Sequence, residues 1–127
     1  MSFAVAAVAL AGCQTTDSRT LSPVAVAGLP LKIGHFASLN PDCTSMGEVV
    51  ARITKNADHG VVTIQPGQGY TNYPETNPRN HCNYKPTSGV NVIYVSNSGY
   101  IGPDSVGLDF FYPNGSELQF AVNLKVK

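Results

Sequence analysis

The sequence predicts an all-β protein built from antiparallel strands. Three observations lead to this fold class: period-two alternation of apolar and polar residues toward the carboxyl terminus, an Asn-Gly pair between two alternating segments, and a composition rich in turn formers. The 127 residues include 12 glycines and nine prolines. Glycine and proline interrupt helices and occupy turns, so their abundance favours short strands joined by turns.

The clearest element is a hairpin formed by residues 105–112 and 118–127. Apolar residues alternate with polar or small ones in both segments, as expected for strands with one buried face. Asn114-Gly115 lies between them, and we assign to this pair the positive backbone angles that a tight hairpin turn needs. The apolar positions of the two segments are Val106, Leu108, Phe110, Tyr112, Leu118, Phe120, Val122, Leu124 and Val126.

Four further segments are predicted as strands. Residues 90–96 are apolar on both faces, which indicates a central strand. Residues 61–65 form a short strand after the turn Asp58-His59-Gly60, and residues 31–39 form an opening strand that ends at Asn40-Pro41-Asp42. Residues 45–55 fit two patterns. Ser45 and Glu48 match a helix capping box, but β-branched residues in alternation favour a strand here, and we prefer the strand.

Residues 66–88 form a long connection with four prolines, four asparagines and three tyrosines. A connection of this length in a small domain is usually functional. Tyr70, Tyr73 and Tyr84, with His81 beside them, are therefore the best candidates for binding a ligand, because tyrosine offers a flat apolar face and a polar tip. The alternative is that the tyrosines cap one end of the fold and the asparagines serve turns.

Cys13 gives the strongest indication of location. It ends the run Leu10-Ala11-Gly12-Cys13 after the apolar residues 3–11, and this resembles the lipobox of bacterial lipoproteins. The resemblance implies that residues 1–12 are a signal peptide and that Cys13 is acylated and anchors the protein in a lipid membrane. Met1-Ser2 lacks the Lys or Arg that opens most signal peptides, so either the start lies upstream or the signal is a weak one. The other alternative is a buried hydrophobic strand or helix with an incidental cysteine.

The lipoprotein resemblance divides the chain into three parts. After the signal peptide, residues 13–30 are expected to be a lipidated cysteine and a flexible tether of Thr, Ser, Pro, Ala and Gly. Residues 31–127 are expected to form one β-sandwich domain. Gln14 is not the Asp that retains some lipoproteins at the inner membrane, so we expect the outer membrane of a bacterial cell envelope.

Cys43 and Cys82 remain if Cys13 carries lipid. Export to an oxidising compartment makes a disulfide between them the expected state. The alternative is a metal site formed by Cys43, Cys82 and His81, which no Cys-x-x-Cys spacing supports. We therefore expect the disulfide, with no metal and no cofactor.

Residues 99–106, 108–112 and 114–115, with the alternating final strand, are similar to the closing half of bacterial cadherin-like and immunoglobulin-like domains. The segment Ala57-Asp58-His59-Gly60-Val61-Val62 is similar to a turn of the same domains. The whole also resembles small exported alphaproteobacterial proteins of uncharacterised function. The resemblance implies an antiparallel immunoglobulin-like (cadherin-like) β-sandwich of about six to seven strands. It carries over no metal site, because the acidic calcium motifs of cadherins are absent.

The polar residues outside the long connection suggest structural roles. Asp104 is expected to accept hydrogen bonds from turn amides, and Asp109, five positions away, to face solvent on the opposite side of its strand. His59 is expected in a turn, and His35 half-buried on a strand. The sequence contains no Gly-x-Ser-x-Gly nucleophile motif, and we predict no enzyme activity.

Eight basic and eight acidic residues balance, which makes nucleic acid an improbable partner. The expected function is a non-catalytic envelope lipoprotein acting as a structural or protein-interaction module. The alternative is a glycan- or peptidoglycan-binding module that uses residues 66–88. A hydrolase or metalloprotein dependent on His81 is a third hypothesis.

Overall fold

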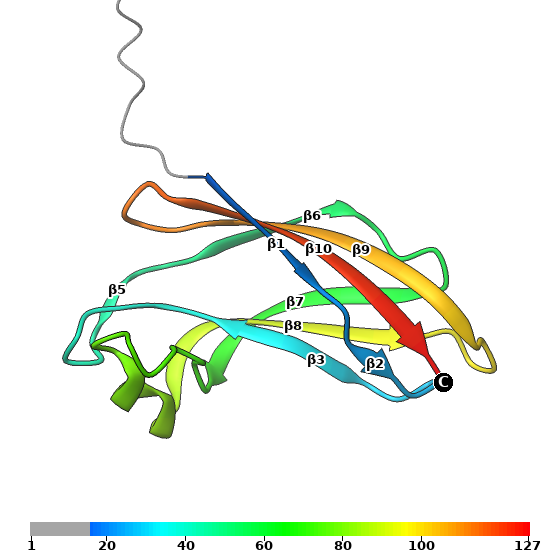
Figure 1. Cartoon of the computed structure of the whole chain (residues 1–127), viewed down its shortest axis with the longest axis horizontal. Coiled ribbons are helices and arrows are strands. Elements are labelled where there is room, and N and C mark those ends of the chain that lie inside the picture. The colour runs from blue at the N-terminus through cyan, green and yellow to red at the C-terminus, as the bar shows by residue number, and fades with distance from the viewer. Residues whose placement is uncertain (1–15) are drawn as a thin grey trace, which may run out of the picture.

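The computed structural model describes residues 16–127. The predicted signal peptide, residues 1–12, and the predicted lipidation site, Cys13, lie outside the described residues. Within them the chain forms ten strands and one short 3-10 helix (Figure 1), which are, in order, β1 (Thr16–Leu21), β2 (Val24–Ala25), β3 (Leu31–Phe36), β4 (Ser38–Leu39), β5 (Ser45–Gly47), β6 (Val50–Lys55), β7 (Gly60–Gly69), η1 (Asn80–Tyr84), β8 (Thr87–Ser96), β9 (Gly102–Phe111) and β10 (Glu117–Val126).

The strands form two sheets that pack over one core. The first sheet has the order β1-β10-β9-β6, with β2 also paired to β10, and the second sheet has the order β3-β8-β7. Strands β4 and β5 form a separate small ladder. Pairing is antiparallel except at β1 and β2, which run parallel to β10. The chain is therefore all-β with antiparallel sheets, as the sequence predicts. None of the helical structure within residues 16–127 is long and apolar enough to cross a membrane.

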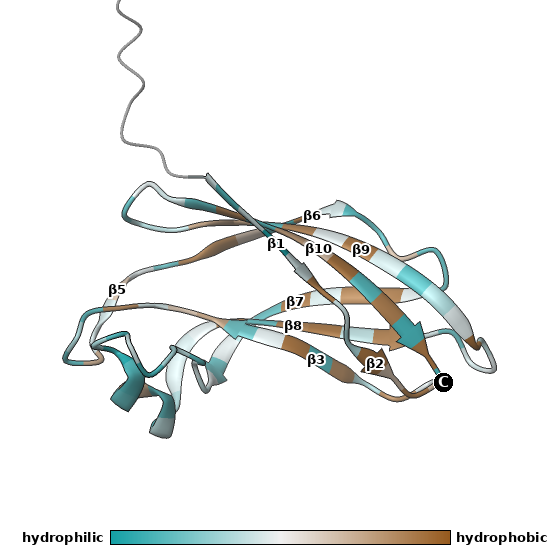
Figure 2. Ribbon diagram, in the orientation of Figure 1, coloured by the Kyte–Doolittle hydropathy of each residue, from teal (hydrophilic) through white to brown (hydrophobic). Residues whose placement is uncertain are grey.

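Alternating residues of β8, β9 and β10 fill the space between the sheets. Val92 and Tyr94 of the second sheet are fully buried, as are Leu108, Phe110 and Val122 of the first sheet. Apolar and polar residues alternate along these strands in Figure 2. Phe36 of β3 stacks on Phe110 with ring centroids 3.9 Å apart, a geometry that adds about 0.5–1.5 kcal/mol beyond area burial. The period-two pattern of the sequence thus identifies the core correctly.

The hairpin between β9 and β10 is confirmed, but its turn differs from the predicted one. The amide of Gly115 donates to the Tyr112 carbonyl at 3.0 Å, and the amide of Tyr112 donates to the Ser116 carbonyl at 2.9 Å. Gly115 alone takes a positive φ, of 87°, while Asn114 does not. Asn114 instead accepts the Ser116 amide through its side chain at 3.0 Å. Pro113 favours a type I turn, and the glycine then supplies the bulge that closes such three-residue loops.

The prediction of a flexible tether over residues 13–30 is wrong for residues 16–25. β1 pairs with β10 along its whole length, from Thr16 opposite Glu117 to Leu21 opposite Val122. Every β1 side chain before Leu21 is exposed, so the strand carries no apolar alternation for sequence reasoning to detect. Backbone hydrogen bonds to β10 position this strand, and they depend little on side-chain type.

The strand predicted at residues 61–65 extends to Gly69, and the strand predicted at 90–96 begins at Thr87. Pro66 lies inside β7 opposite Val90. Because β7 is the outer strand of the second sheet, the missing proline N–H is tolerated there. The predicted 66–88 connection therefore shrinks to residues 70–86, which we call the tyrosine loop.

Other expectations for the strands are confirmed. β8 is the central strand of the second sheet. Residues 45–55 are extended, as β5 and β6, and residues 31–39 form β3 and β4 with a break at Ala37.

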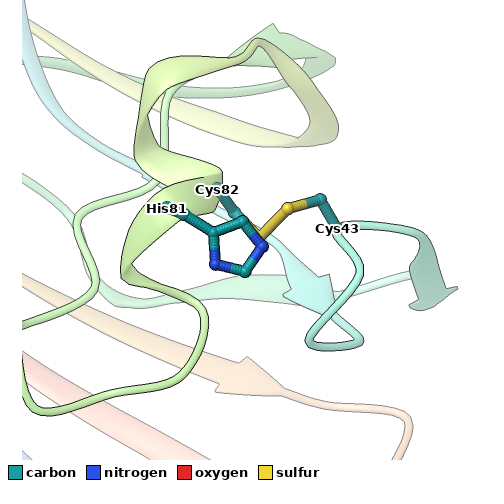
Figure 3. A group of neighbouring side chains, drawn as sticks. All are labelled: Cys43, His81 and Cys82. Carbon is teal, nitrogen blue, oxygen red and sulfur yellow. A yellow bond between two sulfur atoms is a disulfide. The ribbon is translucent and has the colours of Figure 1, made fainter.

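A disulfide joins Cys43, in the turn between β4 and β5, to Cys82 in η1, as predicted, with the Cα atoms 5.5 Å apart (Figure 3). Cys43 has a φ of 70°, a left-handed conformation that the turn imposes. The bond fastens the tyrosine loop to the β4–β5 ladder.

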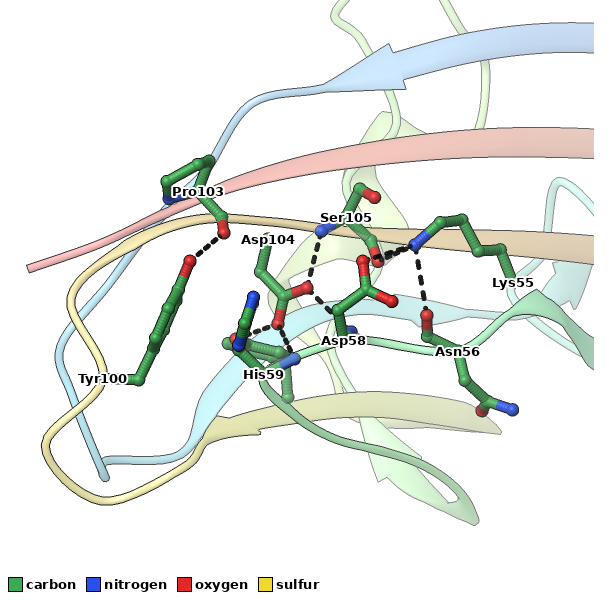
Figure 4. Close-up of polar contacts among 9 residues, drawn as sticks. Lys55, Asn56, Asp58, His59, Tyr100, Pro103, Asp104 and Ser105 are labelled. Atoms are coloured by element: carbon green, nitrogen blue, oxygen red, sulfur yellow. Dashed lines mark hydrogen bonds and ion pairs between the residues drawn. The ribbon is translucent and has the colours of Figure 1, made fainter.

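The buried carboxylate of Asp104 joins the two sheets at the end opposite the tyrosine loop (Figures 1 and 4). The Tyr94 hydroxyl donates to it from the second sheet at 2.7 Å. The amides of Asp58, His59 and Ser105 donate at 2.9, 3.1 and 2.9 Å. Burial raises the pKa of this carboxyl, but the four hydrogen bonds, the Tyr94 bond foremost, outweigh burial and leave the pKa below its ordinary value of 3.8.

The predicted role of Asp104, accepting turn amides, is confirmed, and the Tyr94 bond adds a link between the sheets. His59 lies in the same turn and stacks on Tyr100, with ring centroids 3.9 Å apart and planes at 7°. The Tyr100 hydroxyl donates to the Pro103 carbonyl (Figure 4). This end of the molecule is thus closed by polar contacts around one carboxylate.

We predict that Asp104→Asn lowers the free energy of unfolding by about 2–3 kcal/mol at pH 7, because the amide turns a donor toward groups that are themselves donors. The folded-state pKa is depressed, so the stabilisation is present above pH 3.8 and is lost as the pH falls through the folded-state pKa. Urea unfolding across the acid range measures both effects. Asp58→Asn, at an exposed position, is the matched control and is expected to cost less than about 0.5 kcal/mol. Equal losses in the two variants would contradict the assignment.

Candidate functional site: a groove between the two sheets

A groove of about 890 Å³ opens between the two sheets on the side of β1 and β3. Figure 1 shows the sheets separating toward the end that carries the β9–β10 hairpin and the tyrosine loop. Residues 32–39 line the groove as a continuous run, while β1 contributes alternate residues, Asp17, Arg19 and Leu21. The groove therefore lies at the end remote from the Asp104 carboxylate.

The interior of the groove is apolar and its margins are charged. Several apolar lining residues also pack on the core and are partly or fully buried, among them Ile33, Phe36, Leu118 and Phe120. Positively and negatively charged side chains both occur around the opening, so the groove favours no single sign of charge. The charged lining residues are Asp17, Arg19, Lys32, Arg79 and Glu117. Such a lining suits a ligand with both apolar and polar groups.

The structure divides the four predicted binding residues into two pairs. Tyr70 and Tyr73 line the groove, and Tyr70 remains 60% exposed. Tyr84, 83% exposed, and His81 belong to η1 and do not line it. The four residues predicted to bind a ligand therefore do not form a single site.

Tyr112 also lines the groove, although it is not one of the four predicted binding residues. Burial raises the pKa of its hydroxyl to about 12; the nearby Tyr73 adds to the rise, and the positive charge of Arg19 opposes it. Its hydroxyl therefore stays protonated at neutral pH. A signal was present in the sequence, since Tyr112 continues the inward-facing positions of β9.

Asparagine side chains hold the tyrosine loop in shape. The Asn83 carbonyl oxygen accepts from the Thr71 hydroxyl at 3.0 Å and from the Tyr73 amide at 2.9 Å. The amide groups of Asn83 and Asn80 donate to the Tyr73 carbonyl at 2.8 and 2.9 Å. Tyr73 is thus positioned by its own backbone contacts. These asparagines serve the loop, as the alternative interpretation proposed.

Arg79 and the disulfide fix the loop to β4. The Arg79 guanidinium donates through Nε to the Leu39 carbonyl at 2.6 Å. The Cys43–Cys82 bond lies beside this contact and closes a segment of 39 residues. One noncovalent and one covalent link therefore position the same wall of the groove.

His35 is half-buried on the groove wall, where the sequence placed it. Its Nδ1 atom lies 2.8 Å from the Asn91 side-chain oxygen, which makes Nδ1 the protonated nitrogen, and its Nε2 atom lies 3.5 Å from the Thr87 hydroxyl. These two contacts explain its position in the sheet.

Asp109 differs from expectation, because it is half-buried and not solvated. It lies opposite Arg52 of β6, and its Oδ1 atom has no hydrogen-bond partner among the described residues. Burial raises the pKa of its carboxyl, the neighbouring Glu117 carboxyl raises it further, and the charge of Arg52 partly offsets them. The Arg52 guanidinium also lies 5.3 Å from the centre of the Phe111 ring. Asp109 lies on the face of β9 that the apolar–polar alternation predicts to point outward, but the neighbouring Arg52 and Glu117 side chains shield it from solvent.

Within residues 16–127, the group of metal-ligating residue types that comes together is Cys43, His81 and Cys82. The two sulfur atoms are bonded to each other, so neither is available as a thiolate in this state. The groove itself offers stacking surfaces, hydroxyls, two guanidinium groups and carboxylates. These groups are suited to binding.

Comparisons with known proteins give no family. No family model matches the sequence, and no curated protein matches it. Two solved structures resemble the fold. One is described as the solution structure of Amebosin, with 11% identity, a TM-score of 0.46, and coverage of 89% of this chain and 98% of that chain. The other is PbICP-C in complex with falcipain-2, with 11% identity, a TM-score of 0.41, and coverage of 89% and 92%.

We predict that replacing both Cys43 and Cys82 with serine lowers the free energy of unfolding by about 2–5 kcal/mol. The loss of the bond removes the covalent link between the tyrosine loop and the β4–β5 turn and leaves the Arg79 contact with Leu39, so amides near Tyr73 should also exchange faster with solvent. Denaturant unfolding and hydrogen exchange measure the two effects. Unchanged exchange in the loop would mean that Arg79 and the asparagines alone hold it.

We predict that Asp109→Asn stabilises the protein at pH 7. A carboxyl with a raised folded-state pKa makes stability fall as pH rises from 3.8 through that pKa, because the folded state keeps the proton longer. The neutral amide removes this loss, and the gain should vanish below pH 3.8. Thermal unfolding over that pH range, with Asp17→Asn as an exposed control, provides the measurement. A less stable variant at pH 7 would show that pairing with Arg52 dominates.

Proposed function

We propose that this protein is a non-catalytic lipoprotein of the bacterial cell envelope whose groove binds an extended segment of a partner protein. Its fold is proposed to be an immunoglobulin-like β-sandwich with seven principal strands. The sheet orders support this, since β3, β6, β7, β8, β9 and β10 correspond in chain order to strands B to G of that fold. Those strands divide into sheets B-E-D and C-F-G in both cases.

The observation that carries the proposal is the open edge of β3 along the groove. β3 pairs with β8 on one side only, and no other described strand pairs with it. The groove lining includes the unbroken run of residues 32–39. An edge of this kind leaves alternate N–H and C=O groups free to pair with an added strand.

The groove lining suits the side chains of such an added strand. Alternate residues would face the apolar interior formed by Phe36, Leu118 and Phe120, and the others would meet the charged margins. Tyr70, Tyr73 and Tyr112 lie where the strand would end. Tyrosine and arginine contribute disproportionately to the binding energy of protein interfaces, and both are present.

The predicted lipid anchor bears on where the partner is found. Three steps of chain separate Cys13 from Thr16, and an extended chain covers at most about 10 Å in that length. Asp17, at the start of β1, already lines the groove. With Cys13 acylated, the groove would lie close to the bilayer surface, and we infer a partner in or near the same membrane, which we expect to be the outer membrane.

A glycan is the second candidate ligand. Tyr70 and Tyr73 supply aromatic faces on which sugar rings could stack, and Asn72 and Thr71 add polar groups to the lining. Tyr84 and His81 take no part in this version, because they lie outside the groove.

The two exposed tyrosines provide a matched test. A photo-crosslinking residue at Lys32, an exposed groove position, is introduced into chains carrying Tyr70→Ala or Tyr84→Ala. In cells we expect a polypeptide adduct whose yield falls about tenfold with Tyr70→Ala, a loss in the range expected when a tyrosine that contributes strongly to an interface is truncated. Tyr84→Ala should leave the yield unchanged.

Retention on purified peptidoglycan separates the two ligands. Retention that Tyr70→Ala abolishes, without a protein adduct, would replace the protein partner with a glycan. An adduct yield that both variants leave unchanged, together with no peptidoglycan retention, would reject the groove as the binding site.

We predict that Cys13→Ser prevents acylation, because serine has no sulfur to form the thioether. Cells fed a labelled fatty acid should incorporate the label into the wild-type chain only, and the variant should leave the membrane fraction. A variant that remains labelled and membrane-bound would show that Cys13 is not the anchor.

A further inference from the structure

The Cys43–Cys82 disulfide has a histidine beside it. The Nε2 atom of His81 lies 3.8 Å from the Cys82 sulfur, and the ligand atoms of the three residues all lie within 4.8 Å of one another. Figure 3 shows the imidazole ring directed at the disulfide. Cys82 is buried, Cys43 is half-buried and His81 is exposed, so the cluster opens to solvent on the histidine side.

These positions are close to those of a metal site with two thiolates and one imidazole. Zinc–sulfur and zinc–nitrogen bonds of about 2.3 and 2.0–2.1 Å, at tetrahedral angles, place sulfur and nitrogen about 3.6 Å apart and two sulfurs about 3.8 Å apart. The distance from the Cys82 sulfur to the His81 nitrogen already has this value within a few tenths of an ångström, and the Cys43 sulfur lies within 4.8 Å of the imidazole. Separation of the two sulfurs is the remaining change.

The cluster has support that does not depend on the disulfide. The Cys43 amide donates to the Asn40 carbonyl at 2.9 Å, and the Cys82 amide donates to the Arg79 carbonyl at 2.8 Å. The bond from Arg79 to the Leu39 carbonyl joins the same two segments. None of these three contacts involves the sulfur–sulfur bond, so all three remain available to hold the two segments near each other when that bond is broken.

We propose that reduction converts this cluster into a binding site for one thiophilic d10 cation, Zn²⁺ or Cu⁺, held by Cys43, His81 and Cys82. A dithiol reductant supplies two electrons and two protons; it is oxidised to its own disulfide, and the protein disulfide becomes two thiols. The cation then displaces the two thiol protons and binds both sulfurs and Nε2. Thiolate and imidazole donors select these ions, and a water occupies any fourth position on the exposed side.

The bound cation would replace the covalent link between η1 and the β4–β5 turn. The wall of the groove that the tyrosine loop forms would then stay in place under reducing conditions. Metal binding and groove integrity would thus be coupled through the same three side chains.

The test uses the full chain, reduced with a phosphine and titrated with Co²⁺ as a spectroscopic probe, followed by competition with Zn²⁺. Reduced protein should bind one Co²⁺ and show thiolate-to-metal charge-transfer absorption, whereas oxidised protein should show none. His81→Ala should weaken Co²⁺ binding at least tenfold, and His59→Ala, an exposed histidine elsewhere, should not. The Cys43→Ser/Cys82→Ser variant should lose the absorption.

Three results would overturn the proposal: no stoichiometric binding by the reduced protein, equal affinity of His81→Ala and wild type, or charge-transfer absorption in the double serine variant. Circular dichroism covers the case in which reduction unfolds the chain. In that case, adding Zn²⁺ should restore the β-sheet spectrum of the reduced wild-type protein but not that of the double serine variant. If Zn²⁺ does not restore the wild-type spectrum, the proposed site is rejected.

Discussion

The fold depends on one buried carboxylate. Asp104 lies at the start of β9 and accepts hydrogen bonds from the turn before β7 and from Tyr94 of the second sheet. A buried carboxylate without partners would cost several kcal/mol, so this arrangement forms only when both sheets and the turn are in register. The hydrogen bonds to the Asp104 carboxylate hold the two sheets together at this end. The sheets are free to separate at the other end.

At the end where the sheets separate, which carries the tyrosine loop, other interactions stabilise the structure. Among residues 16–127, no comparable carboxylate holds the sheets there; the disulfide, Arg79 and two asparagines hold the tyrosine loop instead. These contacts join the loop to its surroundings without filling the space between the sheets. The groove is the consequence, and its aromatic residues are placed by contacts that already exist before any ligand binds.

Much of this fold could be predicted from the sequence, because its central strands have one buried face. Val106, Leu108 and Phe110 alternate strictly, and the β9–β10 hairpin follows from them and from the glycine of its turn. β1 could not be found in the same way. Its side chains face solvent, and its position is decided by backbone pairing with β10, which leaves no trace in side-chain pattern.

The candidate site was predicted only in part. Tyr70 and Tyr73 were proposed from composition and do line the groove, but Tyr84 and His81 were grouped with them because they are near in sequence. The last two belong to the short helix η1 and do not line the groove. Asp109 shows the converse difficulty: the alternation gives its face correctly, but the Arg52 and Glu117 side chains that shield it come from neighbouring strands. The register between strands, which the sequence does not state, decides the surroundings of Asp109.

Native-state hydrogen exchange along β3 tests the central claim, that this strand presents an open edge to the groove. In the free protein, amides that point to β8 should exchange slowly, and the intervening amides that point to the groove should exchange at rates close to those of an unprotected chain. Alternation of this kind would support the account. Uniform protection along residues 31–36 would contradict it, because it would mean that the edge is already paired.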